Sequence, residues 1–128
     1  MGMFLIKPAK NGFVFTLRAG NGKTIAVSES YSSEAACRKG IASVQKNAPI
    51  APTEDQTLHH KVSVNNPKFE LYHDKASKFR FRLKAQNGEI IAASEGYASK
   101  QNCLNGILSV KINANNAGIT MQQPEETN

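Results

Sequence analysis

The chain has 128 residues, 40% hydrophobic and 20% charged, which is ordinary for one globular domain or for two very small units sharing a core. No apolar run reaches the roughly 20 residues that a membrane-spanning helix needs, and the opening MGMFLIKPAK lacks the features of a secretory signal. We therefore expect a cytoplasmic protein with no membrane partner. The net charge of +6 permits binding to polyanions without establishing it.

A tandem duplication organises the chain. Asn87-Gly88 repeats Asn21-Gly22 at a distance of 66 positions (87 minus 21), and an ungapped shift of 66 brings many further identical residues together. The matches include Leu5 with Leu71, Phe13 with Phe79, Tyr31 with Tyr97, Cys37 with Cys103 and Ala48 with Ala114. This repetition predicts two units, residues 1–52 and 67–122. Residues 53–66 would be a linker or an exchanged strand, and residues 123–128 a disordered tail.

Each unit is predicted to begin with three strands. A short first strand is expected at 3–7 and again at 69–73. The second strand alternates in period two, with phenylalanine and leucine on one side and polar residues on the other. Its apolar side carries Phe13, Phe15 and Leu17 in the first unit and Phe79, Phe81 and Leu83 in the second. The Asn-Gly pairs favour a type I′ hairpin leading into a third strand at 23–29 and 89–95.

A helix is predicted to follow the strands in each unit, at 34–47 and 100–113. Ser33 and Ser99 stand at the N-cap positions, where a hydroxyl can accept a hydrogen bond from a first-turn amide. Apolar residues spaced by three and four form a stripe that would face the sheet. The stripe includes Gly40 and Gly106, which suggest a close approach between helix and strand, and Cys37 and Cys103, which we expect to be buried and reduced.

The predicted fold class is α+β. One unit of about 50 residues is too small to be stable alone, so two units are expected to share a core. The expected architecture is one antiparallel sheet with pseudo-twofold symmetry and with both helices packed on one face. A fourth strand in each unit is expected at Leu58–Val64 and at Gly118–Gln122.

The second unit carries the pattern FRFRLKAQNGEIIAASEGYASK, which continues through Cys103, Gly106-Ile107 and Ser109-Val110. This pattern resembles the YegP-like family, small bacterial proteins with one or two copies of a domain of unknown function. The first unit departs from it at Thr16 and Ser30. The resemblance implies repeats of three strands, a helix and a strand, with the strand after each helix exchanged between repeats. It supplies no established activity and no catalytic residues.

A basic stripe is the first candidate binding site. Arg80, Arg82 and Lys84 alternate with the apolar residues of their strand, so they would lie on the sheet face without helices, together with Arg18. Guanidinium groups suit phosphate, which favours a nucleic-acid interface. A merely solvated face that keeps the sheet soluble is the favoured interpretation, because no aromatic residue alternates with the arginines to stack on bases.

A duplicated Ser-Glu-x-Tyr motif is the second candidate. It places Glu29 and Tyr31 in the first unit and Glu95 and Tyr97 in the second, each between the third strand and the helix. A carboxylate beside a phenol could act as an acid/base pair. An architectural role, with tyrosine packing over the helix start and glutamate bonding the turn, is the favoured interpretation. A symmetric ligand site in the groove between the repeats stays open.

The remaining polar residues indicate no catalytic chemistry. Adjacent His59 and His60 on a strand would point to opposite faces, and neither they nor His73 stand at metal-ligand spacing. We therefore expect no metal, no cofactor and no enzymatic activity. The sequence favours a non-catalytic binding module, monomeric or homodimeric, whose partner is a protein or a small ligand. The alternative is a nucleic-acid-associated protein that uses the basic stripe.

Overall fold

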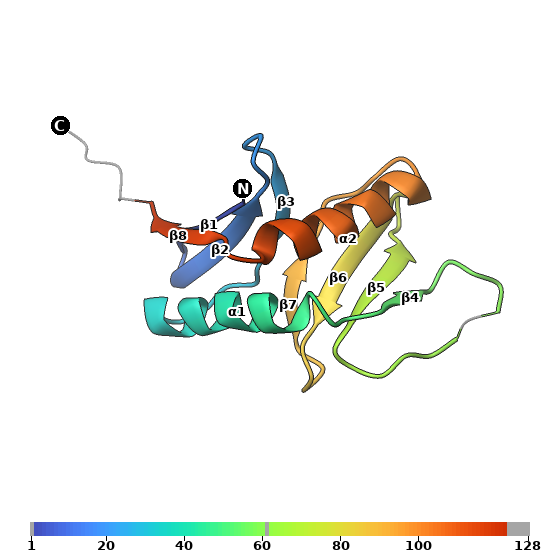
Figure 1. The fold of residues 1–128 in the computed structure, drawn as a ribbon, viewed down its shortest axis with the longest axis horizontal. Helices are drawn as coiled ribbons and strands as arrows, with labels where there is room; N and C mark the ends of the chain where they lie inside the picture. The colour runs from blue at the N-terminus through green and yellow to red at the C-terminus, as the bar shows by residue number, and fades with distance from the viewer. Residues whose placement is uncertain (1, 61, 123–128) are drawn as a thin grey trace.

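The computed structural model describes residues 2–60 and 62–122, which form one eight-stranded sheet with two helices on the same face (Figure 1). The α+β class and the placement of both helices on one face are confirmed (Figure 1). The strands lie across the sheet in the order β4-β5-β6-β7-β3-β2-β1-β8. Along the chain the elements are β1 (Met3–Ala9), β2 (Gly12–Arg18), β3 (Thr24–Val27), α1 (Glu34–Asn47), β4 (Thr53–Asp55), β5 (Lys68–His73), β6 (Phe79–Lys84), β7 (Ile90–Ala93), α2 (Lys100–Ala114) and β8 (Gly118–Met121).

The sheet is mixed, so the prediction of a wholly antiparallel sheet is wrong at both edges. β8 pairs in parallel with β1, and β4 pairs in parallel with β5. The strand that follows each helix thus joins the first strand of the other unit. A parallel neighbour needs a long connection, because the chain must return to the same end of the sheet. Helix α2 with its flanking turns leads into β8, and the loop 56–67 leads from β4 to β5.

The first of these edge strands was misplaced by sequence reasoning. The predicted strand at Leu58–Val64 is absent, since its described residues form turns, bends and irregular backbone. The strand is Thr53–Asp55 instead, which corresponds at a distance of 66 to Ile119–Met121. The apolar residues Leu58 and Val62 favoured the wrong segment, yet both side chains are exposed.

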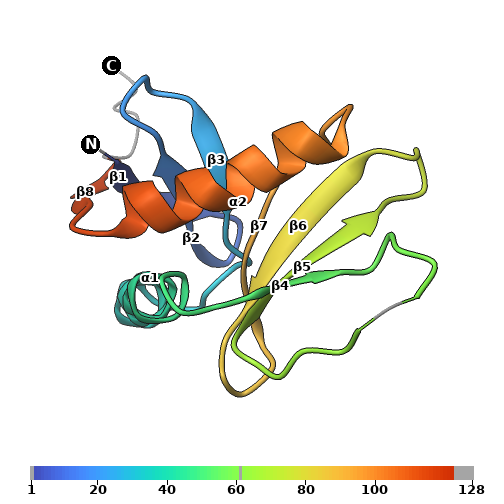
Figure 2. The same cartoon turned by 45° about the vertical axis from the view of Figure 1, so that its right-hand side comes forward.

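The two halves of the molecule share one core. They meet at β3 and β7, which are joined by the bridge between Val27 and Ala93. Helix α2 packs on β6 of its own unit and also on β2 and β3 of the other, as Figure 2 shows, while α1 packs on β2 and reaches β7. Each helix therefore covers strands of both units, which explains why neither unit has to be stable by itself.

The core rests on four fully buried phenylalanines, and they correct the sequence alignment. Phe4 contacts Phe15 edge to face, and Phe69 contacts Phe81 in the same way. Phe4 pairs with Leu17 across the sheet as Phe69 pairs with Leu83, so Phe69 is the counterpart of Phe4, 65 positions away. The predicted match of Leu5 with Leu71 is wrong.

One extra residue in a turn causes this shift. The paired residues Pro8 and Phe13 enclose residues 9–12, whereas His73 and Phe79 enclose residues 74–78. Because successive side chains of a strand point to opposite faces, a slip of one position exchanges core and surface. The true counterpart of Leu5 is consequently Glu70, which lies on the face without helices.

The Asn-Gly turns differ from the predicted type. Gly22 and Gly88 have positive φ values of 85° and 86°, but neither asparagine does. The amide of Gly22 donates to the carbonyl of Ala19, which closes a longer loop with the glycine in the left-handed position. The side chain of Asn21 accepts a bond from the amide of Lys23, and Asn87 does the same for Glu89.

The helix starts are as predicted. Ser33 accepts a hydrogen bond from the amide of Ala36, and Ser99 from that of Asn102, at 3.0 and 3.1 Å. The helix glycines, however, make room for a tyrosine ring as well as for a strand. A Cβ on Gly40 would overlap the Tyr31 hydroxyl and press on the Phe15 ring. Cys37 and Cys103 are free and buried, as expected.

Candidate functional site

The basic stripe does not form a free cationic surface. Arg80 pairs with Asp74, and the guanidinium of Arg82 lies 2.6 Å from the carboxylate of Glu70. The ammonium of Lys84 reaches the same carboxylate at 3.3 Å. Three of the four predicted phosphate-binding cations are thus paired with two carboxylates of this chain, which compensate part of their charge.

The carboxylates of this network are strongly stabilised in their charged form. Burial by itself raises the pKa of Glu70, but hydrogen bonds from Arg82 and Lys84 outweigh it and hold the pKa below its usual value. Hydrogen bonds from Gln56, Lys68 and the backbone lower the pKa of Glu54 to about 2. The amide of Val64 donates one of these bonds, so the loop 56–67 is tied to the network.

Arg18 lies apart from the other three cations. It stands on β2 in the first half of the sheet and forms no ion pair with any residue that the structure describes. Its Nε atom is buried without a hydrogen-bond partner, and so is the hydroxyl of Thr16, two residues earlier. The predicted stripe therefore has two parts. Arg80, Arg82 and Lys84 form ion pairs, whereas Arg18 forms none with the described residues.

The described contacts of the Ser-Glu-x-Tyr motif lie within the fold, although its residues make different contacts from those predicted. Ser28 accepts a hydrogen bond from the amide of Phe15 and donates to the carbonyl of Glu29, and Ser94 repeats this arrangement. The serine, and not the glutamate, bonds the turn. Tyr31 stacks on Phe15 with a centroid distance of 6.2 Å, and Tyr97 on Phe81 at 6.3 Å.

The four motif residues predicted to share a groove are not brought together. Glu29 and Tyr31 line a cavity of about 490 Å³ with Glu89 of the other unit. Tyr97 lines a different cavity, and Glu95 lines none of those found among the described residues. Burial, reinforced by nearby acidic groups, raises the pKa of both tyrosines, so both phenols are protonated at neutral pH.

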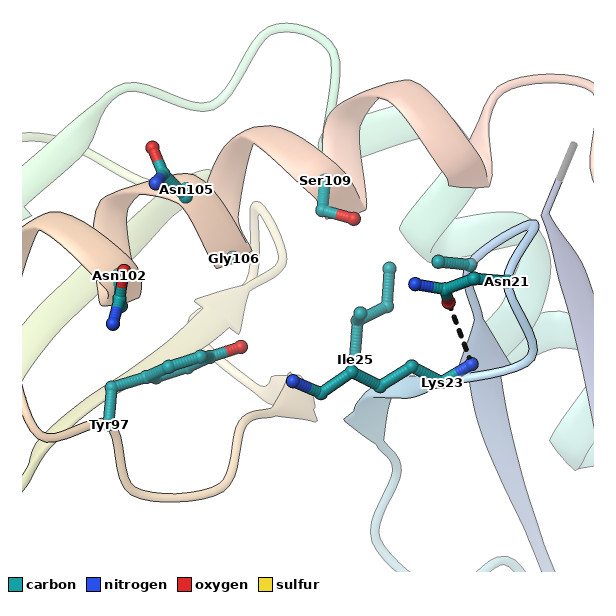
Figure 3. Close-up of a pocket in the computed structure, with 9 residues that line it drawn as sticks. Asn21, Lys23, Ile25, Tyr97, Asn102, Asn105, Gly106 and Ser109 are labelled. Carbon is teal, nitrogen blue, oxygen red and sulfur yellow. Dashed lines mark hydrogen bonds between the residues drawn. The ribbon is translucent and has the colours of Figure 1, made fainter.

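The cavity around Tyr97 is lined by six polar side chains, and we call it the α2 groove. It has a volume of about 360 Å³ and lies between α2 and the β2–β3 turn of the other unit. Asn102, Asn105 and Ser109 approach it from α2, while Asn21 and Lys23 approach from the turn, as Figure 3 shows. The groove contains no carboxylate.

A second groove repeats this geometry on the other helix. It lies between α1 and the β6–β7 turn, has a volume of about 380 Å³, and is lined by Ser43 and Asn87, the counterparts of Ser109 and Asn21. Lys39 and Lys46 supply its charge. Sequence reasoning proposed a groove between the repeats and named Tyr97 for it, but it missed the other residues that line the two grooves, because the two walls of each groove belong to different units. The only signal was that Asn21 and Ser109 each recur in the other unit.

The remaining sequence predictions concern the histidines, a metal site and a membrane-spanning helix. His59 and His60 lie outside any strand, with ring centroids 5.2 Å apart, so the expected opposite-face geometry does not apply. Among residues 2–60 and 62–122, no three histidine, cysteine or acidic side chains gather as a metal site would require. Within those residues no helix has the length and apolar character needed to cross a membrane.

Comparison with known proteins places the chain among relatives without an assigned activity. A family profile described as a domain of unknown function (DUF1508) matches residues 9–55 and 74–120. The UPF0339 protein YegP of Escherichia coli O6:H1 is 42% identical over 109 residues, which cover 85% of this chain and 86% of that protein. The solution NMR structure of yegP from E. coli, a protein of unknown function, superposes with a TM-score of 0.79 at 35% identity, covering 98% of this chain and 96% of that one.

A shorter relative shows that the repeat also occurs alone. A UPF0339 protein of the archaeon Methanosarcina acetivorans is 60% identical over 52 residues, which are 41% of this chain but 90% of that protein. That relative is therefore about one repeat long.

Proposed function

Since the chain belongs to the YegP-like UPF0339 family, whose domain has no assigned function, we propose from its own geometry that it is a non-catalytic binding module. The proposed site is the α2 groove, and the proposed ligand is small, rich in oxygen and anionic, such as a carboxylate or a phosphate. The observation that carries this proposal is the convergence of polar side chains from two different units on one cavity.

The lining of the α2 groove offers several hydrogen-bond donors and one cation. Lys23 brings an ammonium group, and the hydroxyl of Tyr97 has no hydrogen-bond partner among the described residues. The side-chain oxygen of Asn21 is already engaged by the amide of Lys23, which leaves its NH₂ group to donate. With no carboxylate in the lining, an anionic oxygen ligand would meet complementary charge.

Several features support binding without catalysis. The groove pairs no general base with a nucleophile, and its tyrosine is held protonated by burial. The nucleic-acid alternative is less favoured, because Arg80, Arg82 and Lys84 are already engaged in ion pairs with Asp74 and Glu70. The free, buried cysteines support a cytoplasmic location as part of this proposal, since thiols persist in reducing compartments.

The proposal is tested by two-dimensional ¹H–¹⁵N NMR titration with acetate, citrate and inorganic phosphate at fixed ionic strength. We expect at least one of these anions to shift the amides of residues 21–25 and 102–109 in a saturable way. Lys23→Gln should weaken that binding about tenfold, because it removes the only cation of the lining. Lys10→Gln, an exposed lysine in the β1–β2 turn, is the charge-matched control and should bind as the wild type does.

The proposed ligand class fails if all three anions leave these amides unchanged, or if Lys23→Gln and Lys10→Gln behave alike. A fluorescence assay with labelled single-stranded RNA from 50 to 300 mM salt addresses the alternative. Tight binding that fades with salt and is weakened by Arg80→Ala with Arg82→Ala would favour nucleic acid instead.

A further inference from the structure

The sheet face without helices has different chemistry in the two halves of the molecule. Strand pairing defines a row of side chains that crosses this face from β8 to β4. In the first half the row is neutral, and in the second half it is mostly charged. Its members in order are Thr120, Leu5, Thr16, Val27, Ala93, Arg82, Glu70 and Glu54.

On the side of the sheet without helices, β8, β1, β2 and β3 form a surface that we call the first-half face. Its members point away from the helices because their strand neighbours Phe4, Ile6, Phe15 and Leu17 are buried on the helix side. None of its four strands contains an aspartate or a glutamate. The first-half face consists of Met3, Leu5, Lys7, Val14, Thr16, Arg18, Val27 and Thr120.

Two polar groups of this face are buried without partners. Thr16 is 5% exposed, and its hydroxyl forms no hydrogen bond with a described residue. The Nε atom of Arg18 is also buried and also lacks a hydrogen-bond partner among the described residues. Buried donors and acceptors are ordinarily hydrogen-bonded, so these two groups are exceptions within the fold. Arg18 as a whole is only half-buried, which leaves part of its side chain open to an acceptor supplied from outside the chain.

The second half shows what such an acceptor looks like. Arg82 and Lys84 occupy the positions that Thr16 and Arg18 occupy in the first half, and the carboxylate of Glu70 bonds both. Leu5 stands where Glu70 would be. The first-half face thus keeps the cation of the charged arrangement and lacks its carboxylate.

We propose that the first-half face docks a segment of a partner protein that presents apolar side chains beside a carboxylate. The partner's carboxylate binds Arg18 much as Glu70 binds Lys84 in the other half. Lys7, at the opposite end of the face, offers a second contact for an acidic residue. The geometry complements the net charge of +6, which attracts acidic partners over longer distances.

The apolar members of the face are the reason to choose a protein segment over a free anion. Met3 is 41% exposed and Val27 37%, while Leu5 and Val14 between them are half-buried. A free anion would satisfy Arg18 and leave this apolar surface in water. A partner segment covers both, and an arginine flanked by apolar contacts is a common anchor of protein interfaces.

The test uses a pair of blocked twelve-residue peptides in which threonine and leucine alternate with either glutamate or glutamine. Binding to the full-length protein is followed by ¹H–¹⁵N NMR and by fluorescence anisotropy of the labelled peptide. We expect the glutamate peptide to shift amides of β1, β2 and β3 and to bind at least tenfold tighter than its glutamine counterpart. Arg18→Gln should remove most of that difference, and Lys7 and the net charge account for the remainder.

Leu5→Glu supplies the decisive second variant. It places a carboxylate of this chain beside Arg18, so it should weaken the glutamate peptide at least tenfold while keeping the arginine. Arg38→Gln, on α1 on the other side of the sheet, matches the charge change of Arg18→Gln and should leave binding intact. Circular dichroism and thermal unfolding establish that each variant is folded.

Three outcomes would overturn the proposal. The first is equal binding of the two peptides, or no shift of first-half amides by either. The second is a dependence of the same amide shifts on protein concentration without peptide, which would assign the face to a second copy of the chain. The third is a shift of these amides in Glu125→Gln with Glu126→Gln, which would assign the face to the chain's own final residues.

Discussion

The two halves of the sheet are alike on one face and unlike on the other. On the helix side, Phe4 and Phe69 occupy the same place, as do Leu17 and Leu83, and all four are fully buried. On the opposite side, Leu5 corresponds to Glu70 and Thr16 to Arg82. After duplication the core kept its residues, because close packing penalises any change of volume. The exposed face could diverge, because solvent accepts either chemistry.

The same backbone arrangement thus carries two chemically different surfaces. In the second half, carboxylates and cations neutralise one another beneath a loop. In the first half, a cation is left beside exposed apolar side chains. We therefore assign a structural role to the charged network of the second half and, as proposed above, an interaction role to the first-half face.

The largest effect is expected from Glu70→Gln. This change leaves the cations around the buried carboxylate without compensation, and breaking a buried ion pair on one side costs about 3–5 kcal/mol. Urea unfolding measures the loss directly. The exposed pair of Glu34 and Arg38 provides the control, and Glu34→Gln should cost less than about 1 kcal/mol.

Transplanting the chemistry of the first half should remove most of that cost. In the fourfold change Glu54→Thr, Lys68→Met, Glu70→Leu and Arg82→Thr, each position receives the residue of its first-half counterpart. We expect stability within about 2 kcal/mol of the wild type, because replacing a whole buried charge cluster is far milder than breaking it. A loss as large as that of Glu70→Gln would show that the halves are not interchangeable.

The pH dependence of stability should come mainly from the second half. The pKa of Glu54 is about 2 in the folded protein against 4.5 ordinarily, so its contribution is complete above pH 4.5 and is lost as the pH falls towards 2. The shift corresponds to about 3 kcal/mol. Glu54→Gln should flatten the acid limb of a plot of unfolding free energy against pH. An unchanged acid limb would contradict the assigned network.

A smaller and symmetric effect is expected at the helix glycines. Gly40→Ala and Gly106→Ala each drive a methyl group into a tyrosine hydroxyl, at a net cost of about 1–2 kcal/mol after the better helix propensity of alanine is included. Thermal unfolding should show similar losses at the two sites. Adding Tyr97→Phe to Gly106→Ala should recover part of the loss, and strict additivity of the two changes would argue against the contact.

The smallest effect is expected at the helix caps. Ser33→Ala and Ser99→Ala each remove one hydrogen bond to a first-turn amide, for a loss of about 1 kcal/mol apiece. Because the two caps are far apart, their effects should add in the double variant when measured by urea unfolding. A marked difference between the losses of unfolding free energy in the two variants would show that the two helix starts are not equivalent.

The sequence by itself determined the features that depend on neighbours along the chain. The duplication, the period-two strand around Phe15 and Phe81, the capping serines and the helix lengths follow from local spacing, and each was predicted. Buried Cys37 and Cys103 were predicted for the same reason, because they fall on the apolar stripe of their helices.

Only the tertiary structure decided how residues far apart in sequence meet. Glu70 reaches Arg82 because β5 and β6 pair in one particular register, and that register depends on a single extra residue in the turn between them. The α2 groove exists because the helix of one unit faces the turn of the other. Strand register and the docking of one unit on the other are collective results of packing, so local spacing carries no direct record of them.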